Sequence, residues 1–170
     1  MTNIVDESYL NYKEVLLNLQ AAKDVSLRIW AGDHFRRVLV LIMANYLENE
    51  VKTILIEFSK LKSGSDLVSS FVEKSMKGKF HTYFEWKGNN ANIFFALFGD
   101  TFKAEAIKDV DSTNDLEEGI KAFLEIGYTR NVLIHERLHL AKIGDKTTEE
   151  FYESFKKAVV FVEYIKKKLN

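Results

Sequence analysis

The sequence predicts an all-α fold, namely a bundle of four main antiparallel helices with short extra helices, in a single domain spanning residues 1–170. The chain contains no proline and only eight glycines, whereas β-sandwiches need turn-forming residues every ~8–12 positions. Apolar residues recur at steps of three and four over long stretches, which is the spacing of one face of an α-helix. A length of 170 residues suits one domain with one core.

The composition excludes several functional classes. The absence of cysteine rules out a disulfide framework, a thiolate zinc site and a cysteine nucleophile. With 24 basic and 25 acidic residues the net charge is -1, so nonspecific nucleic-acid binding through bulk positive charge is not indicated. The N-terminal segment is polar and acidic, and no uncharged stretch reaches the ~18 residues of a membrane span. We therefore expect a soluble cytoplasmic protein without a membrane partner, in which any nucleic acid binds at a local site.

Two long helices are predicted in the first third of the chain. One runs from about Asp6 to Ile29, and the other runs from about Phe35 to Lys60 with Glu48 on its polar face. The tetrapeptide AGDH, Ala31–His34, is the predicted break because it contains a glycine between two helical patterns. Such a short connection makes the two helices antiparallel neighbours.

The middle of the chain is less regular. Ser65 is expected to cap a short helix that runs through Met76, and residues 77–90 are expected to form a loop. Asn92–Gly99 is apolar on nearly every side and ends in a glycine suited to a helix cap, which predicts a short buried helix. Asp100 is expected to cap the next helix. The loop aromatics either pack over the bundle end or form a stacking platform for single-stranded bases: they are Phe80, Tyr83, Phe84 and Trp86, interleaved with Lys77, Lys79, His81 and Lys87.

Two further long helices close the chain. The first begins near residues 112–115 and reaches about Ala141, and the glycine at position 127 predicts a kink in it, because glycine costs a helix about 1 kcal/mol relative to alanine. Thr147 and Glu150 have the spacing of a capping box. They predict the start of a last helix that runs through Leu169.

The densest group of chemically reactive side chains lies in the first of these two helices. The segment YTRNVLIHERLH, from Tyr128 to His139, contains two of the four histidines, two arginines, an asparagine and a glutamate. Two motifs overlap in it. The weaker is H-E-x-x-H, in which His135 and His139 share a helix face and can ligate one zinc ion, with Glu136 as the base. Arg137 would then place a cation beside the metal, and no third ligand is singled out.

The second motif is RNVLIH, from Arg130 to His135. It resembles the R-polar-x-x-x-H signature of the HEPN superfamily of small helical domains, many of which are metal-independent endoribonucleases. A long early helix containing RRVLVLIMANYLENEV (Arg36–Val51) and an aromatic-rich middle ending in LFG (Leu97–Gly99) agree with that resemblance. Within the superfamily the sequence is most similar to the RiboL-PSP-type and related HEPN-like nucleases of bacterial conflict systems.

This resemblance implies a toxin or defence-system endoribonuclease that needs no cofactor or metal and leaves a 2',3'-cyclic phosphate on its RNA substrate. Characterised members bring two motifs together across a dimer interface, which implies a homodimer with a composite active site. A toxin of this kind would be neutralised by an antitoxin protein. The resemblance also allows a noncatalytic HEPN module that binds RNA or a nucleotide, or that serves as an adaptor.

The residues of the motif suit RNA cleavage on chemical grounds. Attack by the 2'-hydroxyl needs a base, a group that stabilises charge on the phosphate, and an acid for the leaving oxygen. We expect His135 to act as base or acid, Arg130 to bind the phosphate through its planar guanidinium, and Asn131 to orient the ring or hold a phosphate. On a helix Arg130 and His135 point about 140° apart. A second copy of His135 in a dimer would supply the missing proton-transfer group.

Five further residues are expected to support the site or contact substrate. Glu48 could brace Arg130 or His135, Arg36 and Arg37 could meet RNA phosphates, and Tyr128 and Glu136 flank the motif. Glu48 also suits an ordinary surface position because long helices need solvated charges, and basic residues near a helix start, such as Arg36 and Arg37, are usually just surface. Taken alone, the motif would also suit a solvated arginine and a hydrogen-bonded core histidine.

Overall fold

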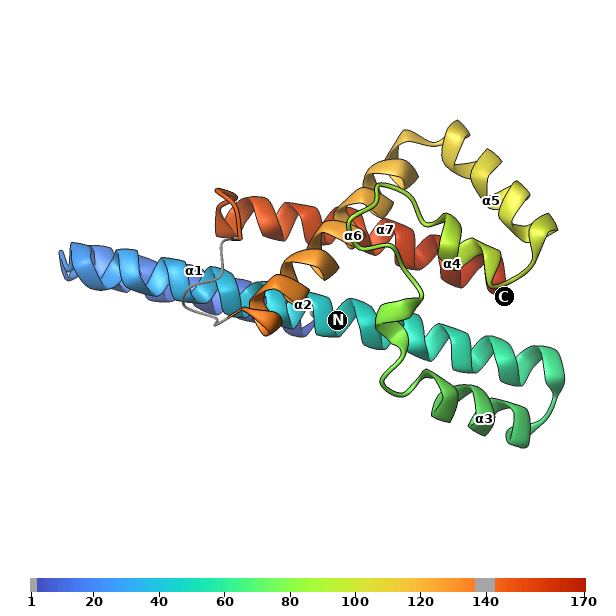
Figure 1. Cartoon of the computed structure of the whole chain (residues 1–170). Helices are drawn as coiled ribbons and strands as arrows, with labels where there is room; N and C mark the ends of the chain where they lie inside the picture. Colours follow the sequence, from blue (N-terminus) through green and yellow to red (C-terminus); the bar gives the residue numbers. More distant parts are fainter. Residues whose placement is uncertain (1–2, 137–142) are drawn as a thin grey trace.

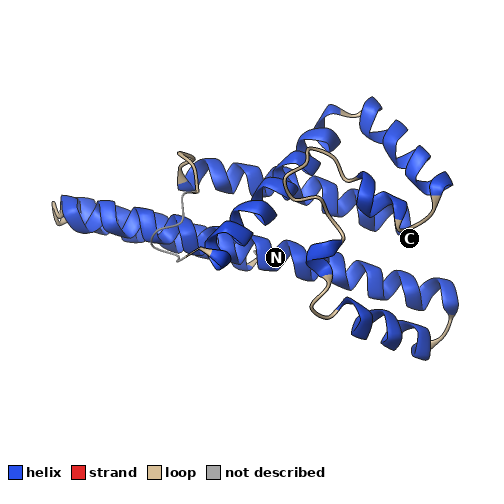
Figure 2. Cartoon of the chain, viewed as in Figure 1, coloured by secondary structure: helices blue, strands red, loops and turns tan. Residues whose placement is uncertain are grey.

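The computed structural model describes residues 3–136 and 143–170, and this part of the chain is built of helices and loops without strands (Figures 1 and 2). The all-α prediction is therefore confirmed. The elements are α1 (Ile4–Ala21), α2 (Val25–Ser63), α3 (Asp66–Met76), the 3₁₀ turn η1 (Phe80–Thr82), α4 (Asn92–Ala96), α5 (Asp100–Ser112), α6 (Asn114–His135) and α7 (Thr148–Leu169). The four longest are α1, α2, α6 and α7, which correspond to the four main helices expected. No helix within the described ranges combines the length and apolar character needed to cross a bilayer.

The predicted break at Ala31–His34 is wrong, because α1 already ends at Ala21 and α2 starts at Val25. Lys23 adopts a left-handed conformation with φ of 57°, and the side chain of Asp24 caps α2 by accepting a hydrogen bond from the Leu27 amide at 2.9 Å. Gly32 lies within α2. A glycine inside a helix costs only about 1 kcal/mol, so the capping aspartate, rather than the glycine, determines where the chain turns.

The expected antiparallel pairing of the first two helices is confirmed. α1 and the first part of α2 (residues 25–35), which we call the arm, run side by side and extend beyond the rest of the molecule (Figure 1). The rings of Tyr12 and Phe35 stack between them with centroids 4.5 Å apart. Most other apolar side chains on the arm, including Leu17 and Trp30, are exposed.

The hydrophobic core lies where α2, α6 and α7 pack together. Its largest fully buried side chains are Phe94, Phe95, Phe123, Phe151, Phe155 and Phe161. Phe123 of α6 meets Phe161 of α7 edge to face with centroids 5.2 Å apart, a favourable aromatic geometry. At Gly119 the two helices are so close that a Cβ would lie 2.8 Å from the Lys157 carbonyl oxygen. This packing fixes the position of α6, which carries the candidate motif.

The ends of the later helices follow the sequence signals in part. Thr147 and Glu150 form the predicted capping box: the Thr147 hydroxyl accepts from the Glu150 amide at 3.1 Å, and the Glu150 carboxylate accepts from the Thr147 amide at 2.7 Å. Asp100 is the first residue of α5 rather than its cap, because Gly99, with φ of 92°, precedes it. α6 ends at His135 instead of Ala141, since Glu136 is extended. Residues 137–142 lie outside the described ranges.

Asp109 of α5 predicts a dependence of stability on pH. It accepts hydrogen bonds from Lys168 at 2.9 Å and from the Tyr164 hydroxyl at 2.8 Å, both on α7. These bonds hold the pKa of its carboxyl below the ordinary value of 3.8. A carboxyl whose pKa is lower in the folded state stabilises the protein above its unfolded pKa, and this contribution is lost as the pH falls through the folded pKa.

We therefore expect Asp109→Asn to lower the melting temperature at pH 7 and to have a smaller effect near pH 3, where the wild-type carboxylate is itself becoming protonated. Melting curves between pH 7 and pH 3 would measure this. Asp111→Asn is the matched control, because Asp111 is exposed on the same helix. If Asp109→Asn lowered the melting temperature by the same amount at every pH, the prediction would be contradicted.

Candidate active site

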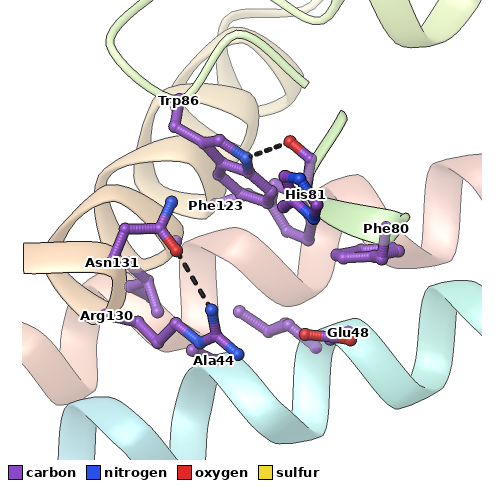
Figure 3. Close-up of a pocket in the computed structure, with 11 residues that line it drawn as sticks. Ala44, Glu48, Phe80, His81, Trp86, Phe123, Arg130 and Asn131 are labelled. Atoms are coloured by element: carbon purple, nitrogen blue, oxygen red, sulfur yellow. Dashed lines mark hydrogen bonds between the residues drawn. The ribbon is translucent and has the colours of Figure 1, made fainter. Parts of the chain in front are cut away.

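A pocket partly open to solvent surrounds Arg130 where α6 faces α2 and the loop of residues 77–91 (Figure 3). We call it the Arg130 pocket. Its lining is mostly apolar, with four polar side chains among the described residues. The lining residues are Ala44, Leu47 and Glu48 of α2; Phe80, His81 and Trp86 of the loop; and Phe123, Ile126, Gly127, Arg130 and Asn131 of α6. Three segments that are distant in sequence therefore meet at the first half of the RNVLIH motif.

Arg130 and Asn131 are held together at the pocket. The guanidinium Nη1 of Arg130 donates a hydrogen bond to the Asn131 side-chain oxygen at 3.1 Å, and both residues are half-buried (Figure 3). Glu48 lines the same pocket from α2, and its ion pair is with Lys52 one turn further along. A guanidinium that is partly shielded and already oriented by one hydrogen bond is well suited to bind an oxyanion, because less side-chain freedom remains to be lost.

Trp86 lines the pocket and lies directly over Gly127. A Cβ at position 127 would come within 2.0 Å of Cζ3 of the indole ring, so only glycine leaves room for it. The indole Nε1 donates to the carbonyl oxygen of His81 at 2.8 Å, and Phe84 and Phe123 pack against the ring. Gly127 allows a close approach between the loop and α6, which runs as one helix from Asn114 to His135.

All four loop aromatics pack in or against the core. Phe80 and Phe84 are buried in the core, which confirms packing over the bundle for these two. Tyr83 is half-buried and packs beside Phe80. Trp86 packs against the core from its half-buried position and also lines the pocket. Sequence reasoning did not place Trp86 or His81 beside Arg130. The signal that could have done so is the glycine inside the motif helix.

His135 lies apart from this pocket within one chain. It is the last residue of α6 and is exposed, so it is not a core histidine, and it is not among the residues that line the Arg130 pocket. Tyr128 and Glu136 are exposed as well and do not line it either. Tyr128 instead lines a second, more open pocket that also includes Trp86, Lys87 and Lys146. The structure thus brings Arg130, Asn131 and Glu48 together and leaves His135 at the open end of the helix.

Arg36 and Arg37 have partners of their own on α2. Both donate to the carboxylate of Asp33, at 2.9 Å and 3.1 Å, and Arg36 also donates to the Lys146 carbonyl oxygen at 2.9 Å. Burial raises the pKa of the Asp33 carboxyl, but the hydrogen bonds and charges of the two arginines outweigh that effect and hold it below its ordinary value. Arg36 therefore ties α2 to the segment that precedes α7, and neither arginine is among the residues that line the Arg130 pocket.

The alternative zinc motif falls partly on residues that the structure does not describe. His139 lies in the undescribed range 137–142. Among the described residues, no group of three or more histidine, aspartate or glutamate side chains is placed to hold a metal ion. His135 is the last residue of α6, and Glu136 follows it in an extended conformation.

Comparison with known proteins adds the family. No curated protein and no solved structure matches this chain. A family model described as RiboL-PSP-HEPN matches residues 6–170, which is nearly the whole chain and includes every residue of the Arg130 pocket. The all-α architecture agrees with the fold that the RNVLIH resemblance implies. The chain therefore belongs to the RiboL-PSP-HEPN family.

Proposed function

We propose that this protein is a metal-independent endoribonuclease that cleaves RNA by attack of the 2'-hydroxyl and leaves a 2',3'-cyclic phosphate. Family membership indicates a HEPN-type nuclease or RNA-binding module. The observation that carries the finer assignment is the half-buried guanidinium of Arg130, oriented by Asn131 in a pocket open to solvent. A toxin or defence role in the cytoplasm, with an antitoxin as partner and without a cofactor, is part of the same proposal.

In this proposal Arg130 binds the scissile phosphate and stabilises the charge that develops on its oxygens as the 2'-oxygen bonds to phosphorus. Asn131 keeps the guanidinium in place through the 3.1 Å hydrogen bond. His135 takes the proton of the attacking 2'-hydroxyl or gives a proton to the leaving 5'-oxygen, because imidazole both takes up and releases protons near neutral pH. The bond from phosphorus to the 5'-oxygen then breaks and the cyclic product leaves.

The proposal includes a homodimer with a composite active site. His135 is exposed at the end of α6 and does not line the Arg130 pocket of its own chain. A second copy related by a two-fold axis can bring its His135 to that pocket, and two-fold dimers are the commonest oligomers. Each site would then use Arg130 from one chain and His135 from the other.

The second candidate is a noncatalytic module that binds RNA or a nucleotide, or acts as an adaptor. The separation of His135 from the Arg130 pocket favours this candidate. A single chain presents Arg130 and Asn131 for phosphate binding without the imidazole of the motif beside them. The two candidates differ in turnover, which an assay separates directly.

The test is incubation of purified protein with end-labelled RNA, in EDTA and separately with zinc, followed by analysis of the fragment ends. We expect cleavage in EDTA with cyclic-phosphate ends, and a loss of about 10²–10³-fold in rate for Arg130→Ala because one electrostatic contact to the transition state is removed. Arg28→Ala, on the arm, is the matched control. Cleavage only with zinc would contradict the proposal, and RNA binding without cleavage would favour the noncatalytic module.

A further inference from the structure

The Arg130 pocket contains an imidazole that the motif does not supply. His81, in the 3₁₀ turn η1, lines the pocket with Arg130, Asn131 and Glu48 (Figure 3). The pocket has no other histidine among its lining residues. Among the described residues, the imidazole that lines the pocket beside Arg130 therefore comes from the loop and not from α6.

The backbone of His81 is held firmly while its side chain is exposed. Its carbonyl oxygen accepts the hydrogen bond from the Trp86 indole at 2.8 Å, and the preceding Phe80 is buried in the core. Two backbone bonds close the turn, from the Thr82 amide to the Lys79 carbonyl at 2.9 Å and from the Tyr83 amide to the Phe80 carbonyl at 3.1 Å. Because the Trp86 ring packs directly over Gly127, the backbone that carries the imidazole is anchored to the same helix turn that carries Arg130.

We propose that His81 is a further catalytic residue of the ribonuclease reaction, an inference that rests on the proposed function. It performs one of the two proton transfers at the phosphate bound by Arg130, and His135 of a second copy performs the other. As the 2'-oxygen bonds to phosphorus, its proton passes to one imidazole. As the bond to the 5'-oxygen breaks, that oxygen takes a proton from the other imidazolium. Arg130, His81 and one His135 then account for all three chemical requirements.

Several charged groups surround His81 and define its electrostatic setting. Glu48 lines the same pocket from α2, and its ion-pair partner Lys52 lies over the ring of Phe80, the residue before His81, at 5.5 Å from the ring centroid. Arg130 faces it from α6, and Lys79 precedes it in its own loop. A phosphate bound in the pocket would add negative charge between these groups, which suits an imidazole that takes up and releases a proton during the reaction.

The test is the pH profile of kcat/KM for RNA cleavage by His81→Gln. The substitution keeps the carbonyl that Trp86 binds, because that group belongs to the backbone. We expect a bell-shaped profile for the wild type, and for His81→Gln a loss of about 10²–10³-fold at the optimum with one limb of the bell abolished. His34→Gln is the matched control, since His34 is an exposed histidine stacked on Trp30 of the arm. It should leave the profile unchanged.

The outcomes separate this inference from the proposed function. If His81→Gln cleaves RNA at the wild-type rate, or loses activity equally at every pH with both limbs of the pH profile retained, the proton-transfer role of His81 is overturned. Cleavage by the wild type would still support the proposed ribonuclease function. Absence of cleavage by the wild type overturns both. Melting curves of His81→Gln check that the loop remains folded, and a retained melting temperature makes any loss of rate a chemical effect.

Discussion

Replacing Gly127 with alanine should lower the free energy of unfolding by about 3 kcal/mol, the upper end of the usual cost of overpacking. The new Cβ would lie 2.0 Å from Cζ3 and 2.2 Å from Cε3 of Trp86. The ring cannot move aside without breaking its hydrogen bond to the His81 carbonyl and its packing on Phe84 and Phe123. Urea unfolding followed by circular dichroism would measure the loss.

The chain provides a matched control for this substitution. Gly32 is also in a helix, but a Cβ there would meet only the Tyr12 hydroxyl at 3.8 Å, an ordinary contact. Gly32→Ala should therefore stabilise the protein by up to ~1 kcal/mol, because alanine is the better helix former. In the double variant Gly127→Ala with Trp86→Ala, the combined loss should be smaller than the sum of the two single losses. A Gly127→Ala protein within ~0.5 kcal/mol of the wild type would contradict the close packing described.

His135→Ala should reduce RNA cleavage by up to ~10⁴-fold, the upper range for removal of a general acid or base. Melting temperature should change little, because His135 is exposed at the end of α6 and no described residue depends on it for packing. Rates on end-labelled RNA and a melting curve would check both statements. Cleavage at the wild-type rate would contradict the assigned role of His135.

Mixing two inactive variants tests whether the site is shared between chains. A dimer of one His135→Ala chain and one Arg130→Ala chain contains one site with both groups intact and one with neither. If chains exchange freely in an equal mixture, half of the dimers are mixed, and each mixed dimer has one intact site out of two. The mixture should therefore recover about a quarter of wild-type activity. Each variant alone should remain inactive. Complete inactivity of the mixture after verified exchange would place Arg130 and His135 of the same chain in each site.

The elements that sequence reasoning located best are those encoded by neighbouring residues. The capping box of Thr147 and Glu150 and the start of α6 each depend on a few consecutive positions. The turn between α1 and α2 was misplaced because a glycine within a helix is a weak signal beside the capping Asp24. Local signals predict well that a helix is present. The exact residue at which one helix ends and the next begins depends on small differences in free energy between neighbouring positions.

The candidate site was predictable only where it lies within one helix. Arg130 and Asn131 are adjacent, so the motif alone identified them as a pair. Their pocket partners His81 and Trp86 come from a loop whose position depends on core packing by Phe80 and Phe84. Periodicity carries no information about such long-range contacts. The same limit applies to His135, whose exposed position follows from where α6 ends rather than from its place in the motif.

The position of Trp86 gives the protein a built-in optical reporter. The chain contains only two tryptophans: Trp30 is exposed on the arm, whereas Trp86 is half-buried over Gly127 in the wall of the Arg130 pocket. The variant Trp30→Phe therefore retains a single indole, and the fluorescence of that indole responds to what enters the pocket. Stopped-flow emission from this protein would follow the arrival of an unlabelled oligonucleotide separately from its cleavage.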